Sequence, residues 1–252
     1  MRRRLVRHLF SLLLLAASCT HDLLPVELGM QPAHVGYVPA AIAILPCRAW
    51  PAGARFKNLP LTSAKDDELA AICATVDKAL LDGFGGQPYM RGYSPKAVKK
   101  QLELAGKGLL LDELPALFAH GADSCLECPT AAAFYNRTVK ERLPFRGWLA
   151  AVAQTAKSPD AALLPFVTYA YDKRYNDRGL HVAERAAGVL LLLVDTAHGE
   201  LLWAGGREAA VANERLEATK VHVDLVPPPW DEATARLLTE DLWREFPGRQ
   251  TY

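Results

Sequence analysis

Hydrophobic positions along this chain change their spacing from segment to segment, and each change marks an expected element. The apolar run from Ala41 to Pro46 is short, carries β-branched residues and ends in proline, which predicts a buried strand. In residues 62–83 the apolar positions fall three and four apart, which predicts a helix capped by Thr62 or Ser63. The residues on its apolar face are Leu69, Ile72, Cys73, Val76 and Leu80.

The middle of the chain has mainly helical spacing. Residues 87–93 are a weak strand candidate, and Ser94 followed by Pro95 opens a helix that ends at Gly106. Residues 109–118 fit either a short strand or a helix broken by its proline. Two further helices are predicted, over 130–142 and 146–156.

Strand spacing dominates after residue 160. The candidates are residues 163–171, 180–195 and 200–212. The turn 196–199 joins the last two as a hairpin, with glycine where a positive φ is needed and Asp195 as the expected cap. The charged residues 172–174 predict a solvated hairpin end between the first two strands.

The order of these elements predicts an α/β (α+β) fold. We expect a mixed β-sheet packed by helices, with a C-terminal antiparallel hairpin and a closing helix over residues 231–246. Trp50, Trp203 and Trp230 are expected in the core, since core packing is the common fate of tryptophan at these spacings. No linker composition interrupts residues 35–246, so a single domain is expected over residues 35–252.

The N-terminus has the composition of an export signal. Four arginines precede an apolar stretch, residues 9–17, that is shorter than the roughly 20 residues of a membrane-spanning helix. Small residues then lead directly to Cys19. This order resembles the lipobox of bacterial lipoproteins, in which the cysteine is acylated and the preceding peptide is removed. The resemblance implies a signal peptide over residues 1–18 and membrane attachment through a lipidated Cys19.

The residues after the anchor cysteine predict where the domain lies. Residues 19–34 contain prolines and glycine without periodicity, which predicts a lipidated tether. In many lipoproteins, aspartate directly after the anchor signals retention at the inner membrane, and here that position is Thr20. The resemblance therefore implies a lipid anchor in the outer membrane and a domain that faces the periplasm.

Charge and composition narrow the class of partner. Residues 1–18 contain four arginines and no acid, so the chain from Cys19 onward has 25 basic and 28 acidic residues. A nucleic-acid binder needs a basic surface, and this balance does not favour one. Half of the residues are hydrophobic, which is enough for a sizeable core.

The segment Val189–Gly205 carries a second resemblance. It consists of an apolar run, Asp195, a turn, Gly199-Glu200, an apolar pair and Trp203. This pattern resembles periplasmic lipoproteins of the CsgG, LpoB and TolB N-terminal type, and also a family of uncharacterised bacterial lipoproteins. The resemblance implies an α/β sheet domain that binds other envelope proteins and does not catalyse. Residues 110–157 are extra to the pattern and are expected to form a helical insertion.

Four cysteines remain after Cys19. In an exported protein an even number favours disulfides, but spacing alone does not choose among the three possible connectivities. Cys125 and Cys128 are close along the chain and are the expected pair. Cys73 is also explained as a small hydrophobic residue on its helix.

The Cys125-x-x-Cys128 motif has two chemical alternatives. A thiol–disulfide oxidoreductase would need the pair at a helix N-terminus that follows a strand, and residues 119–124 do not have a strand pattern. A zinc site could use both cysteines and His120, but the sequence has no second paired set of ligands. The sequence therefore predicts a non-enzymatic accessory module without cofactor or metal, which binds envelope proteins, with the oxidoreductase as the alternative.

Overall fold

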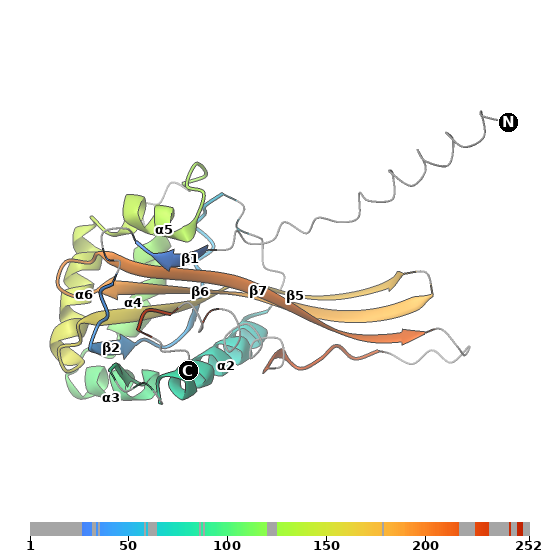
Figure 1. Cartoon of the computed structure of the whole chain (residues 1–252), viewed down its shortest axis with the longest axis horizontal. Helices are drawn as coiled ribbons and strands as arrows, with labels where there is room; N and C mark the ends of the chain where they lie inside the picture. The colour runs from blue at the N-terminus through green and yellow to red at the C-terminus, as the bar shows by residue number, and fades with distance from the viewer. Residues whose placement is uncertain are drawn as a thin grey trace.

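The computed structural model describes residues 27–31, 34, 36–57, 59, 65–85, 87, 89–119, 125–177, 179–216, 225–231, 242 and 246–248. The structural statements below concern these residues. A body of helices packs around one end of a β-sheet, and three long strands continue beyond it (Figure 1).

A seven-stranded mixed sheet organises the molecule, which confirms the predicted α/β class. The strand order is β1-β7-β6-β5-β2-β4, and β3 pairs with β5. Strands β2, β3 and β4 join in parallel, whereas β5, β6, β7 and β1 form an antiparallel series. The strands are β1 (Glu27–Met30), β2 (Ala41–Ile44), β3 (Arg48–Ala49), β4 (Arg91–Tyr93), β5 (Ala161–Asp177), β6 (Leu180–Asp195) and β7 (Leu201–Leu216).

Helices cover both faces of the sheet, and each face has its own core. The helices are α2 (Asp66–Phe84), α3 (Pro95–Leu104), α4 (Leu110–Ala119), α5 (Ala131–Phe134), the π-helix η2 (Tyr135–Val139) and α6 (Leu143–Thr155). One face, here called the α2 face, packs Val189, Leu191 and Leu193 against α2. The other, the α6 face, packs Leu190, Leu192 and Val194 against α3 to α6. The alternation along β6 therefore divides its side chains between two cores.

Helix α2 confirms the predicted apolar face but not the predicted cap. All five predicted residues of its stripe are buried. The helix begins at Asp66, and the Glu68 carboxylate accepts a hydrogen bond from the Lys65 backbone N–H at 2.9 Å. Thr62 and Ser63, the expected caps, lie outside the described residues. Glu68 therefore satisfies the backbone at this helix start.

Residues 110–157 contribute all the described helices of the α6 face except α3. Residues 109–118, which fitted a strand or a helix, form α4 with Pro115 inside it. The predicted helix 130–142 starts as α5 and continues as a π-helix. Phe118, Phe134 and Phe145 pack in the same core as Phe166 of β5. These helices cover the sheet directly, because their aromatic side chains fill that core.

The structure corrects the predicted tether over residues 19–34. Residues Glu27–Met30 form β1, which pairs with β7 from Trp203 to Gly206. The backbone N–H of Gln31 also donates to the carbonyl of Leu202 at 3.0 Å. The pairing uses backbone groups, so a four-residue strand leaves little periodicity in the sequence. Cys19 and the predicted signal peptide lie outside the described residues.

Strands β5, β6 and β7 correct the predicted hairpin end at residues 172–174. These residues lie inside β5, where Asp172 is opposite Arg185 and Lys173 is opposite Glu184. The 17 residues of β5 span about 55 Å at the usual rise of a strand. We call the part beyond the helices the blade: residues 169–177, 180–188 and 207–216 (Figure 1). The prediction failed because charged residues are compatible with an antiparallel ladder whose faces meet solvent.

A β-bulge in β5 lies where the blade begins. The register against β6 shifts between Val167 and Tyr169, and Thr168 is the extra residue. Phe166 faces the α6 core before the bulge, and Tyr169 and Tyr171 face the same side after it. The bulge therefore keeps the aromatic residues of β5 on one face.

The predicted closing helix lies mostly outside the described residues. Trp230 and Asp231 are helical, and residues 232–241 and 243–245 are not described. Leu242 and Phe246 belong to the core of the α2 face, with the Phe246 ring 5.1 Å from that of Trp203. Trp50, Trp203 and Trp230 are all buried, as predicted.

Candidate functional site

The α6 face of the blade carries a network of tyrosines and glutamates. The Tyr169 hydroxyl donates to Glu208, and the Tyr171 hydroxyl donates to Glu184 at 2.6 Å. Tyr175 donates to the other oxygen of Glu184 at 3.1 Å. Burial first, and then the bonds to these carboxylates, raise the pKa of Tyr169 and Tyr171 far above the usual value. Both phenols therefore remain protonated donors, and the network links all three strands.

The α2 face of the blade carries arginine. The Arg185 guanidinium donates to the Pro228 carbonyl at 2.9 Å and lies 4.8 Å from the centre of the Trp230 ring. Asp172 is 3.5 Å away on the neighbouring strand. A cation over an aromatic face is favourable, more so when it is shielded from water. Arg185 thus holds the returning chain against the blade.

We call residues 225–229, the returning chain beside Trp230, the strap. It contains three consecutive prolines, and its residues belong to no helix or strand. The Val226 carbonyl accepts from the Asn213 side chain at 2.8 Å. Pro227 and Pro228 are buried, whereas Val226 and Pro229 are exposed. Because proline lacks an N–H group, this part of the chain is attached through side chains and not as another strand.

The outer edge of β7 is open along the blade. Strand β1 covers β7 only as far as Gly206, and beyond it no described strand pairs with that edge. Residues Ala209–Ala212 are small and uncharged, and Ala210 and Ala212 are exposed. An exposed strand edge offers backbone N–H and C=O groups to an incoming strand. This edge can therefore bind another protein by strand addition.

The sequence did not predict the blade, because the residue pattern of each strand gives no information about its partners on the other strands. Tyr169, Tyr171 and Tyr175 share a period of two, which indicates a strand face. Their glutamate partners come from β6 and β7, and only the register shows those pairs.

The structure places Cys125 and Cys128 in a disulfide, with the Cα atoms 5.2 Å apart. Both side chains are buried, and the Cys128 N–H donates to the Cys125 carbonyl at 2.8 Å in a tight turn. Reactive cysteines of oxidoreductases are partly exposed, so a protein substrate does not reach these sulfurs in this conformation. Within the described part of the chain, no group of three or more His, Cys, Asp or Glu side chains is arranged to hold a metal ion. His120 lies outside that part.

A second disulfide joins Cys47, after β2, to Cys73 on α2, with the Cα atoms 5.1 Å apart. The sequence left this pairing open, since the two cysteines are 26 residues apart and only the packing of α2 brings them together.

The two disulfides are expected to differ in their contribution to stability. In the chain-entropy model, loops of 26 and 3 residues correspond to about 3.5 and about 1.6 kcal/mol. Replacing Cys47 and Cys73 with alanine should therefore destabilise more than replacing Cys125 and Cys128. Urea unfolding of both double variants measures the difference, with reduced wild-type protein as the reference. Equal losses would contradict the assignment.

Asp77 is a half-buried carboxyl beside the Cys47–Cys73 disulfide. Its Oδ1 accepts the Cys47 N–H at 2.8 Å. Burial raises the pKa of Asp77 to about 6, although this hydrogen bond and the charge of Arg48 act in the opposite direction. The charged form is therefore the less favourable one in the folded protein.

The contribution of Asp77 to the free energy of unfolding should fall as the pH rises from about 4 to about 6. The folded pKa of Asp77, about 6, exceeds the unfolded value of about 3.9, so its stabilising contribution is complete below pH 4 and lost above pH 6. Asp77→Asn should therefore gain about 1–2 kcal/mol over wild type at pH 7.5 and nothing at pH 4. Urea unfolding at both pH values tests this, with Asp67→Asn on the exposed side of α2 as control. An equal difference at both pH values would show that Asp77 does not titrate in this range.

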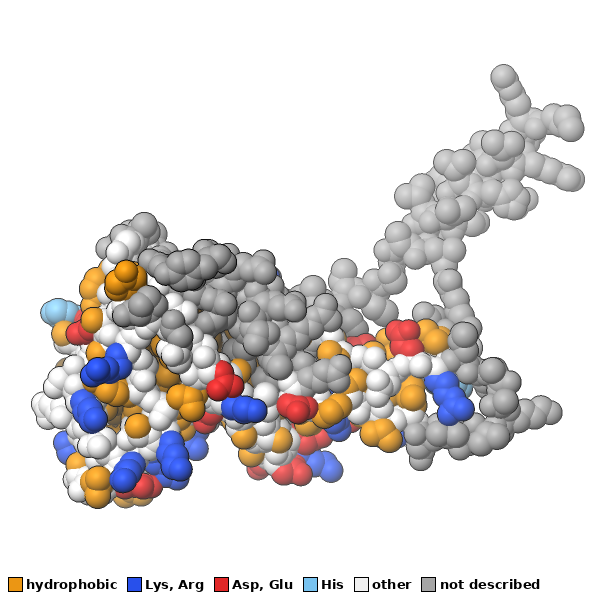
Figure 2. Space-filling view, turned by 60° about the horizontal axis from the view of Figure 1, so that its bottom comes forward, with side chains coloured by type: hydrophobic (Ala, Val, Ile, Leu, Met, Phe, Trp, Pro, Cys, Tyr) orange, Lys and Arg blue, Asp and Glu red, His pale blue; other side chains and the backbone are white. Residues whose placement is uncertain are grey.

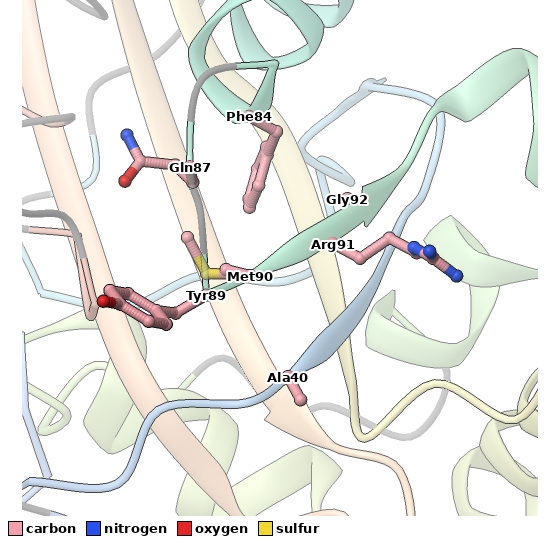
Figure 3. A pocket seen from close by; sticks show the side chains of 7 residues that line it. All are labelled: Ala40, Phe84, Gln87, Tyr89, Met90, Arg91 and Gly92. Carbon is pink, nitrogen blue, oxygen red and sulfur yellow. The ribbon is translucent and has the colours of Figure 1, made fainter.

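A pocket of about 400 Å³ lies at the β4 edge of the sheet, and its lining side chains are drawn in Figure 3. Phe84 and Met90 are its buried apolar residues, and Arg91 points away from it. Gly92 is required there, since a Cβ atom would come within 2.7 Å of the Phe84 ring. The residues that line the pocket, all described, include no carboxylate, histidine or cysteine.

The turn between β6 and β7 lies at the opposite end of the molecule from the blade tip (Figure 1). Asp195 accepts the His198 N–H at 2.8 Å, which confirms it as the turn cap, and Gly199 has φ +73°. The His198 ring lies 3.0 Å from Asp195 and is 79% exposed. This histidine is a solvated turn residue.

Comparison with known proteins gives matches among solved structures alone. No protein-family model matches the chain, and no curated protein is similar to it in sequence. It is similar to the lipoprotein GNA1162 from Neisseria meningitidis, with 15% identity and a TM-score of 0.36 over 69% of this chain and 85% of that one. The LpoB C-terminal domain from Escherichia coli shares 11% identity, with a TM-score of 0.34 over 71% and 87%. A PelC dodecamer from Paraburkholderia phytofirmans shares 10%, with a TM-score of 0.33 over 85% and 91%. At this level of similarity we draw nothing about function from these proteins.

None of the described helices has the length and apolar character to cross a membrane.

Proposed function

We propose that this chain is a lipid-anchored, non-enzymatic lipoprotein of the outer membrane whose domain faces the periplasm and binds another envelope protein. The observation that carries the binding role is the blade with its open β7 edge. A long antiparallel edge without pairing is uncommon, because proteins usually protect such edges with charge, proline or a covering segment. Here the edge stretch Ala209–Ala212 is uncharged, and in the part of the chain that the structure describes no strand pairs with it.

The rigidity of the blade supports this role. The Tyr169–Glu208 and Tyr171–Glu184 hydrogen bonds link its three strands on one face. Arg185 and Trp230 fix the strap on the other. A pre-organised edge loses less conformational entropy when a partner binds than a flexible segment does.

The anchor places the blade close to its membrane. Seven residues, and therefore eight Cα–Cα steps, separate the predicted lipidated Cys19 from Glu27, the first residue of β1. Such a segment spans at most about 28 Å. A partner would therefore be an envelope protein within reach of the outer membrane.

Photo-crosslinking in living cells tests strand addition at β7. A photoreactive amino acid at Ala210 should give a discrete adduct with one protein, because this position is exposed beside the open edge. The same probe at Ala74, an exposed alanine of α2, is the matched control. Adding Ala212→Lys should abolish the adduct, since lysine on an edge opposes strand addition. An identical adduct from Ala74, or none from Ala210, would contradict the proposal.

A further inference from the structure

Helix α3 presents a basic surface at the end of the body away from the blade. Val98 and Leu102 are buried, and the other side of the helix exposes three lysines. Figure 2 shows Lys and Arg side chains gathered on the lower left part of the body, the end at which Figure 1 draws α3. We call the following residues the α3 surface: Lys96, Lys99, Lys100, Leu104, Lys107 and Leu109.

Two leucines are exposed within this basic surface. Leu104 is 74% exposed and Leu109 is 77% exposed, on either side of a short turn. In this turn the N–H of Lys107 donates to the Leu102 carbonyl at 2.8 Å, and Gly106 has φ +68°. The helix end is therefore closed by backbone bonds and holds both leucines at the surface.

The α3 surface remains positive after its acidic neighbours are counted. Glu103 lies 3.8 Å from Lys99, and Glu113 is exposed one turn after Leu109. Asp112 is paired with Arg48 at 2.8 Å. Four lysines thus face two nearby carboxylates that no arginine neutralises.

We propose that the α3 surface binds the headgroup region of an anionic lipid bilayer. Lysines attract anionic lipids, and exposed leucines enter the boundary between headgroups and acyl chains. The leucines favour a bilayer over a soluble anionic polymer, which would gain nothing from their side chains. This proposal goes beyond partner binding at β7, because it gives a second surface and a second ligand.

The fold allows both contacts at once. Strand β4, which leads into α3, lies at one edge of the sheet, and β1 lies at the other. Five strand spacings separate these edges, about 24 Å, so a tether that spans at most about 28 Å can bring α3 to the same bilayer as the anchor. The binding chemistry of α3 itself does not depend on Cys19.

Lipid photo-crosslinking of the full-length lipidated protein in proteoliposomes tests this surface. A photoreactive residue at Leu109 should label acyl chains in vesicles of phosphatidylcholine with phosphatidylglycerol. The same probe at Leu143, which is 81% exposed at the start of α6, is the matched control. The double variant Lys99→Gln/Lys100→Gln should lower the Leu109 labelling about tenfold. The matching change Lys57→Gln, at an exposed lysine outside the α3 surface, should not.

The results of this experiment distinguish lipid binding by the α3 surface from membrane attachment through Cys19. Labelling from Leu109 that exceeds that from Leu143 and falls in pure phosphatidylcholine supports the proposal. Equal labelling from both positions, or labelling independent of phosphatidylglycerol, would overturn it. If Cys19 is not acylated, wild-type protein shows no palmitate labelling at this residue. The comparison of labelling between the two vesicle compositions does not measure that.

Discussion

Cys19→Ala should move the protein from the membrane fraction to the soluble fraction or leave it unprocessed. The lipobox-like order around Cys19 predicts that this thiol carries the acyl chains. Each buried methylene of a lipid chain contributes about 0.8 kcal/mol to membrane affinity, so loss of the chains should remove stable attachment. Metabolic labelling with a palmitate analogue, followed by fractionation, measures both effects.

Thr20→Ala is the matched control for this experiment. It changes the neighbouring residue and leaves the thiol in place, so labelling and attachment should persist. Wild-type protein without palmitate label would show that the anchor assignment is wrong. Membrane attachment that survives Cys19→Ala with its signal peptide cleaved would show that another surface, such as that of α3, is sufficient.

Leu193→Asp should destabilise the fold by about 4 kcal/mol or more. Leu193 is fully buried in the core of the α2 face, opposite Leu163 on β5 and Trp203 on β7. The substitution removes an apolar side chain and introduces a carboxylate without a partner. For a domain of this size the melting temperature should fall by about 10 °C, measured by circular dichroism.

Leu143→Asp provides the control at an exposed leucine. Leu143 is 81% exposed in the first turn of α6, where a carboxylate interacts favourably with the helix dipole. Its melting temperature should therefore equal or slightly exceed that of wild type. Equal melting temperatures for Leu193→Asp and wild type would contradict the buried position of β6.

Elements defined by a strong local pattern were predictable. The stripe of α2, the start of α3 at Ser94-Pro95 and the turn 196–199 agree with the structure, because each depends on residues close in sequence. The limits of β5 and β7 were not predictable from hydrophobicity. Their outer halves carry charged residues that remain paired by backbone hydrogen bonds.

The sequence by itself predicted the mixed α/β class, because periodicity acts locally, and its N-terminal composition predicts an export signal. Only the tertiary structure decided the candidate sites. The bulge at Thr168 sets which side chains of β5 meet Glu184 and Glu208. The pairing of β1 with β7 ends at Gly206, and beyond it the edge of β7 has no partner strand among the described residues. These features depend on the register between distant segments. Backbone hydrogen bonds can form in several registers, so the choice depends on how the side chains of both segments pack and cannot be deduced from one segment alone.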